Sequence, residues 1–320
     1  MTTSTTPPAV PFFIDAPGGH RVCVRLWTSN GAARGIVHWC HGMAEHGGRY
    51  EALAAALNSA GWHLCVHDHR GHGGSISDSA PLGHFGDREG WDAVLSDVQR
   101  VRDHLAPRFP GLPYVLGGHS MGSFVALAYA ERCGHDRAPQ ALVLCGSNHD
   151  TALRYRLALL PISWARWRAG ARGSSPLISK LTFDTWARSI HPRRTEFDWL
   201  STDPATVDAY LADPLCGFDC STQLWHDLLS ALVTVHSPAG LARLPSSLPI
   251  WLMGGRGDPM SRHGKGMVAL ARHLRRAGAE QVTLTQYDGR HEILNDHCQQ
   301  EARGDLLQWL GKVPNSTTER

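Results

Sequence analysis

The chain has 320 residues, which allows one large domain or two smaller ones. Its 31 Lys and Arg residues nearly balance 29 Asp and Glu residues, and the net charge of +2 argues against a nucleic-acid-binding protein. Hydrophobic residues make up 42% of the chain, enough for a sizeable core, yet no run has the length and apolarity of a membrane span. Residues 1–10 lack the features of a signal peptide, so we expect the protein in the cytoplasm. We expect the eight irregularly spaced cysteines, including Cys216 and Cys220, to be free thiols.

Short apolar runs alternate with helical patterns along the first half of the chain. Two runs that flank Pro17-Gly18-Gly19 predict a β-hairpin. The predicted strands are 12–15, 21–27, 35–40, 62–67, 114–117 and 141–145, and the predicted helices are 49–60, 91–105 and 121–133. Strand–helix alternation of this kind predicts an α/β fold, with a mostly parallel central sheet and helices on both faces.

The alternation stops between residues 148 and 239. This segment contains no clear strand, and its pattern predicts several short helices separated by Pro, Gly and Ser. Alternation then resumes, with predicted strands at 250–253 and 281–287 and predicted helices at 262–277 and 292–310. We therefore expect one α/β core, interrupted by a helical cap insertion. The core comprises 1–147 and 240–320, with flexible tails at 1–10 and 313–320, and the cap comprises 148–239.

A serine motif lies on the turn between a predicted strand and a predicted helix. Residues 118–122 read GHSMG and fit G-x-S-x-G, a pattern that lifts the hydroxyl of Ser120 clear of the sheet. A serine needs a base to remove its proton and an acid to orient that base. In this arrangement the acid and the histidine follow in that order on loops after later strands, which indicates Asp258 and His291. Asp288 is a rival acid, but it lies too close to His291 along the same loop.

Acyl transfer also requires donors for the developing oxyanion. One candidate is the backbone N–H of Met121, which follows the serine. The other is the backbone N–H of Met43, in the loop His41-Gly42-Met43 that follows the predicted strand 35–40.

A second motif suggests a different chemistry. Residues 67–72 read HDHRGH and resemble the H-x-H-x-D-H zinc motif of metallo-β-lactamase-like hydrolases. Gly71, however, occupies the place of the metal-binding Asp of that family. We therefore expect no metal and no cofactor, and we expect Asp68 and Arg70 to fix a tight loop.

With these motifs assembled, the chain resembles the α/β-hydrolases of the monoacylglycerol lipase and lysophospholipase family over roughly residues 10 to 311. The blocks that carry the resemblance are 41–46 (HGMAEH) with Arg49-Tyr50, 68–75 (DHRGHGGS), 118–122, and Asp258 with His291. Segments 194–200 (RTEFDWL) and 213–218 (DPLCGF) are similar to the insertion of bacterial members. Ser123 stands where members often have Gly.

The resemblance implies a cap that folds over the serine and leaves an apolar tunnel for an acyl chain. The residues expected to bind substrate are His41, Gly42, Trp164, Trp167 and Trp186. Residues 153–169 mix apolar side chains with four arginines, a surface that could touch an anionic membrane. The alternative is that the apolar face of this segment lines the pocket while its arginines lie in water.

These observations predict a serine carboxylester hydrolase that acts on a single-chain acyl ester, such as a monoacylglycerol, a lysophospholipid or a short-chain to medium-chain ester. Its partner is then a small-molecule acyl ester, and the sequence leaves the oligomeric state open. An acyltransferase or an aminopeptidase-type amidase with the same triad is an alternative. A binding protein that keeps the fold without catalysis is a third hypothesis.

Overall fold

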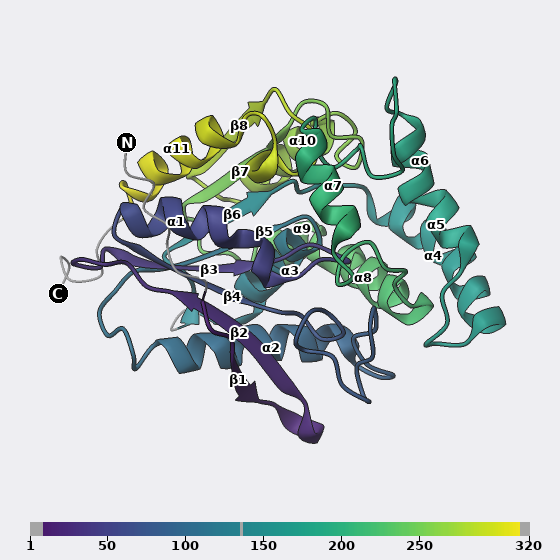
Figure 1. The fold of residues 1–320 in the computed structure, drawn as a ribbon, viewed down its shortest axis with the longest axis horizontal. Helices are drawn as coiled ribbons and strands as arrows, with labels where there is room; N and C mark the ends of the chain where they lie inside the picture. The colour runs from purple at the N-terminus through teal and green to yellow at the C-terminus, as the bar shows by residue number, and fades with distance from the viewer. Residues whose placement is uncertain (1–8, 135–136, 314–320) are drawn as a thin grey trace.

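An eight-stranded sheet forms the centre of the molecule (Figure 1). The computed structural model describes residues 9–134 and 137–313, so the predicted tails 1–10 and 313–320 lie outside it except for residues 9, 10 and 313. The strands are β1 Phe12–Asp15, β2 Arg21–Trp27, β3 Gly35–Cys40, β4 Trp62–His67, β5 Tyr114–His119, β6 Ala141–Cys145, β7 Ile250–Gly255 and β8 Val282–Tyr287. Their order is β1-β2-β4-β3-β5-β6-β7-β8. β2 pairs antiparallel with β1 and β4, whereas the pairs from β4 to β8 are parallel, as predicted.

The middle strands β4, β3, β5, β6 and β7 are buried along their whole length. Strands covered on both faces need continuous apolar runs, which is the pattern their sequences show. β5 and β7 each extend two residues beyond the predicted strands 114–117 and 250–253. The added residues include glycines, which weaken the sequence signal for a strand. Both strands therefore continue directly into the loops that carry the candidate site.

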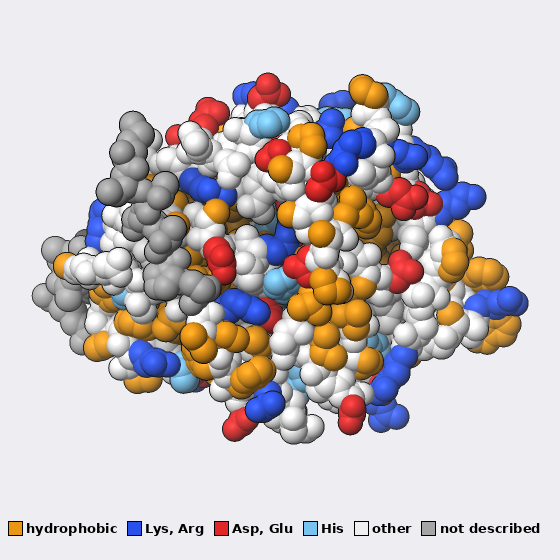
Figure 2. Space-filling view, in the orientation of Figure 1, with side chains coloured by type: hydrophobic (Ala, Val, Ile, Leu, Met, Phe, Trp, Pro, Cys, Tyr) orange, Lys and Arg blue, Asp and Glu red, His pale blue; other side chains and the backbone are white. Residues whose placement is uncertain are grey.

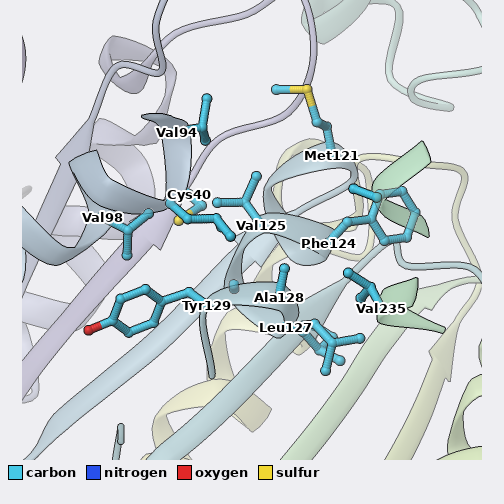
Figure 3. Close-up of a cluster of buried hydrophobic side chains, with 14 of the residues drawn as sticks. Cys40, Val94, Val98, Met121, Phe124, Val125, Leu127, Ala128, Tyr129 and Val235 are labelled. Carbon is cyan, nitrogen blue, oxygen red and sulfur yellow. The ribbon is translucent and has the colours of Figure 1, made fainter. Parts of the chain in front are cut away.

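Helices cover both faces of the sheet, as the alternation predicted. α1 Glu51–Ser59 and α11 Gln299–Leu310 pack on one face, and α2 Gly90–Leu105, α3 Met121–Arg132 and α10 Lys265–Arg276 pack on the other. Figure 3 shows α3 on this second face, where Val125 lies near Cys40 of β3 and Val98 of α2. The core is thus formed by helices pressed against a buried sheet, and it fixes the strand ends in space.

The predicted helix 292–310 is wrong in its first part, because α11 begins only at Gln299. Ile293–Asn295 forms a single 3-10 turn, and Asp296 next to it accepts hydrogen bonds from the N–H groups of Arg290 and Thr202. These bonds hold the chain in an irregular loop, so the apolar residues of this stretch are buried without forming a regular helix. The other predicted helices agree with the structure to within three residues at either end.

The segment between β6 and β7 folds into helices, and residues 146–249, all of them described, form no strand. The helices are α4 Ala152–Ala169, α5 Pro176–Leu181, α6 Phe183–Arg188, α7 Pro204–Ala212, α8 Thr222–Val235 and α9 Pro238–Leu241. α4 packs along α8, and α8 in turn contacts α2 and α3. Figure 1 shows α4, α5 and α6 at one end of the molecule. Within the described ranges, no helix is both long and apolar enough to cross a membrane.

Candidate active site

Ser120 lies between β5 and α3 in a backbone conformation that L-amino acids rarely adopt, with φ 53° and ψ −121°. Hydrogen bonds to neighbouring residues hold it there. Its N–H donates to Cys145 O of β6 at 2.9 Å, and its carbonyl accepts from the hydroxyl of Ser123 at 2.6 Å. A Cβ at Gly122 would collide with the carbonyl oxygens of Cys40 and His41. Only glycine therefore lets this turn approach the end of β3.

Asp258 and His291 lie side by side although they follow different strands, and His291 lines the cavity described below. His291 Nδ1 lies 3.1 Å from Asp258 Oδ2, and both residues are buried. Burial opposes ionisation of Asp258, but the adjacent imidazole of His291 and the N–H of Met260 outweigh it and lower the pKa of Asp258. A charged carboxylate thus faces the Nδ1 side of the ring, which leaves Nε2 as the nitrogen that can accept a proton. The rival Asp288 is exposed.

The loop after β3 contributes Gly42 and Met43 to the wall of the cavity. The N–H of Gly42 is bound by the carboxylate of Glu45. Met121 is the first residue of α3, and the first N–H groups of a helix have no acceptor inside the helix. Met43 and Met121 both line the cavity, together with Ser120.

A buried ion-pair cluster connects this loop to the histidine loop. Arg49 donates to Glu45 at 2.6 Å and holds Glu292 through two bonds of 2.7 Å each. Burial opposes ionisation of Glu45, but Arg49 and His119 lower its pKa well below its usual range. Arg49 thereby joins the residue next to His291 to the residue that binds Gly42.

His119, next to the serine, belongs to the same cluster. Its Nδ1 lies 3.3 Å from Glu45 Oε1, and its Nε2 lies 3.2 Å from the carbonyl oxygen of His291. Both partners only accept hydrogen bonds, so both ring nitrogens are best satisfied when each carries a proton. Burial lowers the pKa of His119, but the carboxylates of Glu45 and Glu292 outweigh burial and raise it above 6.5. With His119 charged, two cations balance two carboxylates.

A cavity of about 700 Å³ opens at Ser120 and His291 and extends among the helices between β6 and β7. Side chains of that segment which line it include Tyr155, Ile162, Ile178, Phe183, Trp186, Trp199, Trp225, Leu228 and Leu232. The rings of Phe183, Trp186 and Trp199 contact one another, and the Trp199 ring lies 5.1 Å from that of His291. An aromatic wall thus runs from the histidine into the cavity.

Three of the residues expected to bind substrate, His41, Trp164 and Trp167, do not line the cavity. Trp164 and Trp167 are 54% and 78% exposed, because they lie on the outer side of α4. His41 is fully buried: its Nδ1 bonds Gly42 O and its Nε2 accepts from the N–H of His69. Trp186 and Gly42 do line the cavity.

Sequence reasoning missed several residues of the site, although signals for some were present. Glu45 and Arg49 are four residues apart in a block that the family resemblance already marked, and Glu292 adjoins His291. Their pairing could not be predicted, because Arg49 and Glu292 are 243 residues apart in the chain. Trp199, one of five tryptophans between residues 148 and 239, lies in the segment 194–200 that the family resemblance marked, but nothing in the sequence placed its ring against His291.

The structure gives the HDHRGH motif a structural role in its loop. Asp68 forms an ion pair with Arg25 and accepts from the N–H groups of Gly47 and Gly74, each at 2.7 Å. Arg70 forms an ion pair with Asp97 of α2 at 2.6 Å. The structural roles predicted for Asp68 and Arg70 are therefore confirmed.

Comparison with known proteins identifies the family of this chain and several of its relatives. The family model described as serine aminopeptidase, S33, matches residues 31–298. The chain is 29% identical to a monoacylglycerol lipase of Mycolicibacterium smegmatis, over 92% of this chain and 94% of the relative. It is 28% identical to the human monoglyceride lipase, over 91% of this chain and 87% of the relative. It also resembles the crystal structure of a thermostable carboxyl esterase from Bacillus coagulans, with a TM-score of 0.86, 26% identity and coverage of 95% and 98%.

The close approach at Gly122 generates a prediction about stability. Gly122→Ala should lower the free energy of unfolding by roughly 1–3 kcal/mol, because the backbone oxygens of Cys40 and His41 cannot yield as a flexible side chain would. Gly304→Ala in α11 is the control: its new methyl group would meet no atom within 4 Å, and it should gain roughly 0.5–1 kcal/mol of stability. Urea denaturation measures both. Equal stability of the two variants would contradict the close packing of this turn.

The raised pKa of His119 predicts a pH-dependent contribution to stability. A raised pKa stabilises the fold below the ordinary value of 6.5, and this contribution is lost as the pH rises through the folded-state value. The difference in free energy of unfolding between the wild type and His119→Gln should therefore be larger at about pH 6 than at about pH 9. Chemical denaturation at both pH values provides the measurement. A difference that stays constant or grows with pH would exclude a charged His119.

Proposed function

The chain belongs to the serine aminopeptidase, S33, family of α/β-hydrolases, and we propose that it cleaves single-chain acyl esters through an acyl-enzyme formed on Ser120. Its relatives are named as monoacylglycerol lipases, and its structural neighbours include a carboxyl esterase, so the chain is an ester-hydrolysing enzyme. The substrates that fit the proposal are monoacylglycerols, lysophospholipids and short-chain to medium-chain esters. The predicted location in the cytoplasm stays a prediction.

The arrangement at one end of the cavity is the main support. Ser120, in a strained turn, and His291, which is paired with the buried carboxylate of Asp258, both line a large apolar cavity. The serine and the histidine supply a nucleophile and a base, and the apolar wall suits an alkyl chain. A peptide amine would call for a dedicated anionic partner. Of the carboxylates that line this cavity, Glu45 and Glu292 are already paired with Arg49, and Asp150 is paired with Arg154.

In the first half of the reaction, the Ser120 hydroxyl attacks the ester carbonyl carbon while Nε2 of His291 takes its proton. Asp258 stabilises the imidazolium that forms. The N–H groups of Met43 and Met121 bind the negative charge that develops on the carbonyl oxygen. The proton on His291 then passes to the leaving alcohol, and the acyl group remains on Ser120.

In the second half, a water molecule enters the site once the alcohol has left. His291 removes a proton from the water, the hydroxide attacks the acyl carbon, and the proton returns to Ser120 as the fatty acid leaves. An acyltransferase would use an alcohol at this step in place of water. Product analysis in the presence of competing alcohols separates the two reactions, and an amide substrate tests the aminopeptidase alternative.

We further propose that residues 148–239 act as a cap that selects the substrate. The acyl chain would extend from Ser120 along Phe183 and Trp186, because these rings form the apolar wall next to the histidine. Each buried methylene contributes roughly 0.8 kcal/mol, so a few contacts suffice to favour one chain length over another.

The outer side of α4 is suited to transient contact with a lipid surface. Leu153, Leu157, Leu160, Trp164 and Trp167 are all more than half exposed and recur at helical spacing. Arginines flank this stripe, and Figure 2 shows hydrophobic and basic side chains together at the end of the molecule where Figure 1 places α4 and α5. Apolar side chains with flanking arginines favour an anionic interface, where acyl esters collect.

Ser120→Ala should abolish turnover and leave the fold intact, because the covalent route needs the hydroxyl oxygen. The variant should retain less than about a thousandth of the wild-type kcat on a p-nitrophenyl ester, with unchanged Tm and no labelling by a fluorophosphonate.

The matched control is Ser123→Ala, a buried serine in the same turn whose hydroxyl donates to Ser120 O. This variant should keep the fluorophosphonate reaction. Substantial kcat in Ser120→Ala, or fluorophosphonate labelling of that variant, would remove Ser120 from the role of nucleophile.

Trp186→Ala should change the chain-length profile of kcat/KM, because Trp186 lines the cavity and contacts Phe183 and Trp199. Loss of a few methylene contacts lowers kcat/KM on a long-chain ester by about tenfold, while an acetate ester, which does not reach this wall, loses far less. A series of p-nitrophenyl esters measures the profile.

Trp164→Ala is the matched control, because this tryptophan lies on the outer side of α4. It should leave the profile on dissolved esters unchanged and weaken co-sedimentation with anionic phosphatidylglycerol vesicles. A parallel loss on acetate and long-chain esters in Trp186→Ala would contradict the acyl tunnel.

A further inference from the structure

Cys40, His67 and His69, one sulfur ligand and two nitrogen ligands, form a buried cluster beneath the loop that follows β3. Cys40 ends β3, His67 ends β4 beside it in register, and His69 follows two residues later. The sulfur of Cys40 and one nitrogen from each histidine lie within 4.8 Å of one another. Exposure is 0% for Cys40 and His67 and 1% for His69. Polar groups in so dry a place need a partner.

His69 has one ring nitrogen in use and one that is bare. Its Nε2 lies 3.1 Å from His41 O, and a carbonyl can only accept, so Nε2 carries the proton. With the ring proton on Nε2, the other ring nitrogen, Nδ1, holds a lone pair. Within residues 9–134 and 137–313, no group bonds to that Nδ1. A ring N–H on a carbonyl, with the other nitrogen free, is the arrangement typical of a metal-binding histidine.

His67 offers a second bare nitrogen through a short relay. Its Nδ1 lies 2.8 Å from His38 Nε2, and His38 Nδ1 lies 2.7 Å from the hydroxyl of Tyr114. When His67 Nδ1 donates to His38, the His67 Nε2 is left with a lone pair. That atom is buried and has no hydrogen-bond partner among the described residues.

We propose that Cys40, His67 and His69 form a buried site for one monovalent copper ion. On binding, the S–H bond of Cys40 breaks, its proton leaves to solvent, and a sulfur–copper bond forms while both imidazoles coordinate through their lone pairs. The copper enters and stays as Cu⁺, so no electron is transferred. The site does not take part in the proposed ester hydrolysis, which needs no metal.

Charge and ligand number select Cu⁺ over Zn²⁺. A thiolate and Cu⁺ sum to zero, and a neutral complex is the one that a dry interior tolerates. Zn²⁺ with the same ligands would leave an uncompensated positive charge. It would also lack the fourth ligand of a tetrahedral zinc site, whereas thiolate and imidazole with no carboxylate suit soft copper.

The proposed ion would join the ends of β3 and β4, below the loop His41-Gly42-Met43. Cys40 directly precedes His41, and His69 holds His41 twice, through its N–H at 2.9 Å and its Nε2 at 3.1 Å. A ligand that binds only the folded chain stabilises it. We therefore expect the loaded protein to unfold at a temperature higher by about 5 °C.

The test loads the full-length protein during anaerobic refolding, because the site is closed to solvent in the folded state. Cu⁺ is supplied as its acetonitrile complex, and loosely held ion is removed with bicinchoninate. Mass spectrometry of the metal should find one copper per chain, and Tm should rise. Cys40→Ser should lose the copper. Cys65→Ser, the matched control at an equally buried cysteine on β4, should keep it.

If Cys40→Ser fails to fold, X-ray absorption at the copper edge of the loaded wild-type protein identifies the atoms bound to copper. It should show one sulfur and two nitrogen neighbours. Copper retained well below one per chain, equal copper loss in Cys65→Ser, or a different ligand set would overturn the proposal. A parallel refolding with Zn²⁺ that gives one tightly held zinc and no retained Cu⁺ would also overturn it.

Discussion

Charge balance around Arg49 is the constraint on which the arrangement of the candidate site depends. Its guanidinium holds two carboxylates in the protein interior, Glu45 after β3 and Glu292 after β8. His119, the last residue of β5, completes the balance. Removing one partner from a buried ion pair leaves an uncompensated charge and costs about 3–5 kcal/mol. The three loops are therefore held as one unit, and none can move far without exposing a charge to a dry environment.

This coupling explains how distant segments stay in register at one place. Glu45 and His119 are 74 residues apart, and His119 and His291 are 172 residues apart. The parallel sheet delivers each loop to the same edge, because strands that run in one direction end on one side. The ion pairs then fix the final positions. Ser120 keeps its unfavourable backbone only because its surroundings determine it so fully.

Much of this arrangement could be predicted from the sequence, because the signals were local. Each triad candidate lies on the turn or loop that follows a parallel strand, β5 for Ser120, β7 for Asp258 and β8 for His291, and the strand–helix alternation predicts where those strands lie. The charge cluster could not be predicted, since its pairs join segments distant in the chain. The sequence also predicts the start of α11 too early, for a similar reason: Asp296 binds the N–H of Arg290 in its own loop and the N–H of Thr202 in a distant segment, and these contacts override the helical pattern.

The misplaced tryptophans show how sequence pattern fails for a helix that is apolar on two sides. α4 turns Tyr155 and Ile162 toward the cavity and Leu160 and Trp164 outward, within the same few turns. Apolar periodicity reveals a core-facing stripe only when the opposite face is polar. In α4 both faces are apolar, so the pattern alone cannot say which one meets the cavity. A helix with two apolar faces is expected where both faces contact apolar groups. One face of α4 lines the cavity, and the other is the proposed lipid-facing surface.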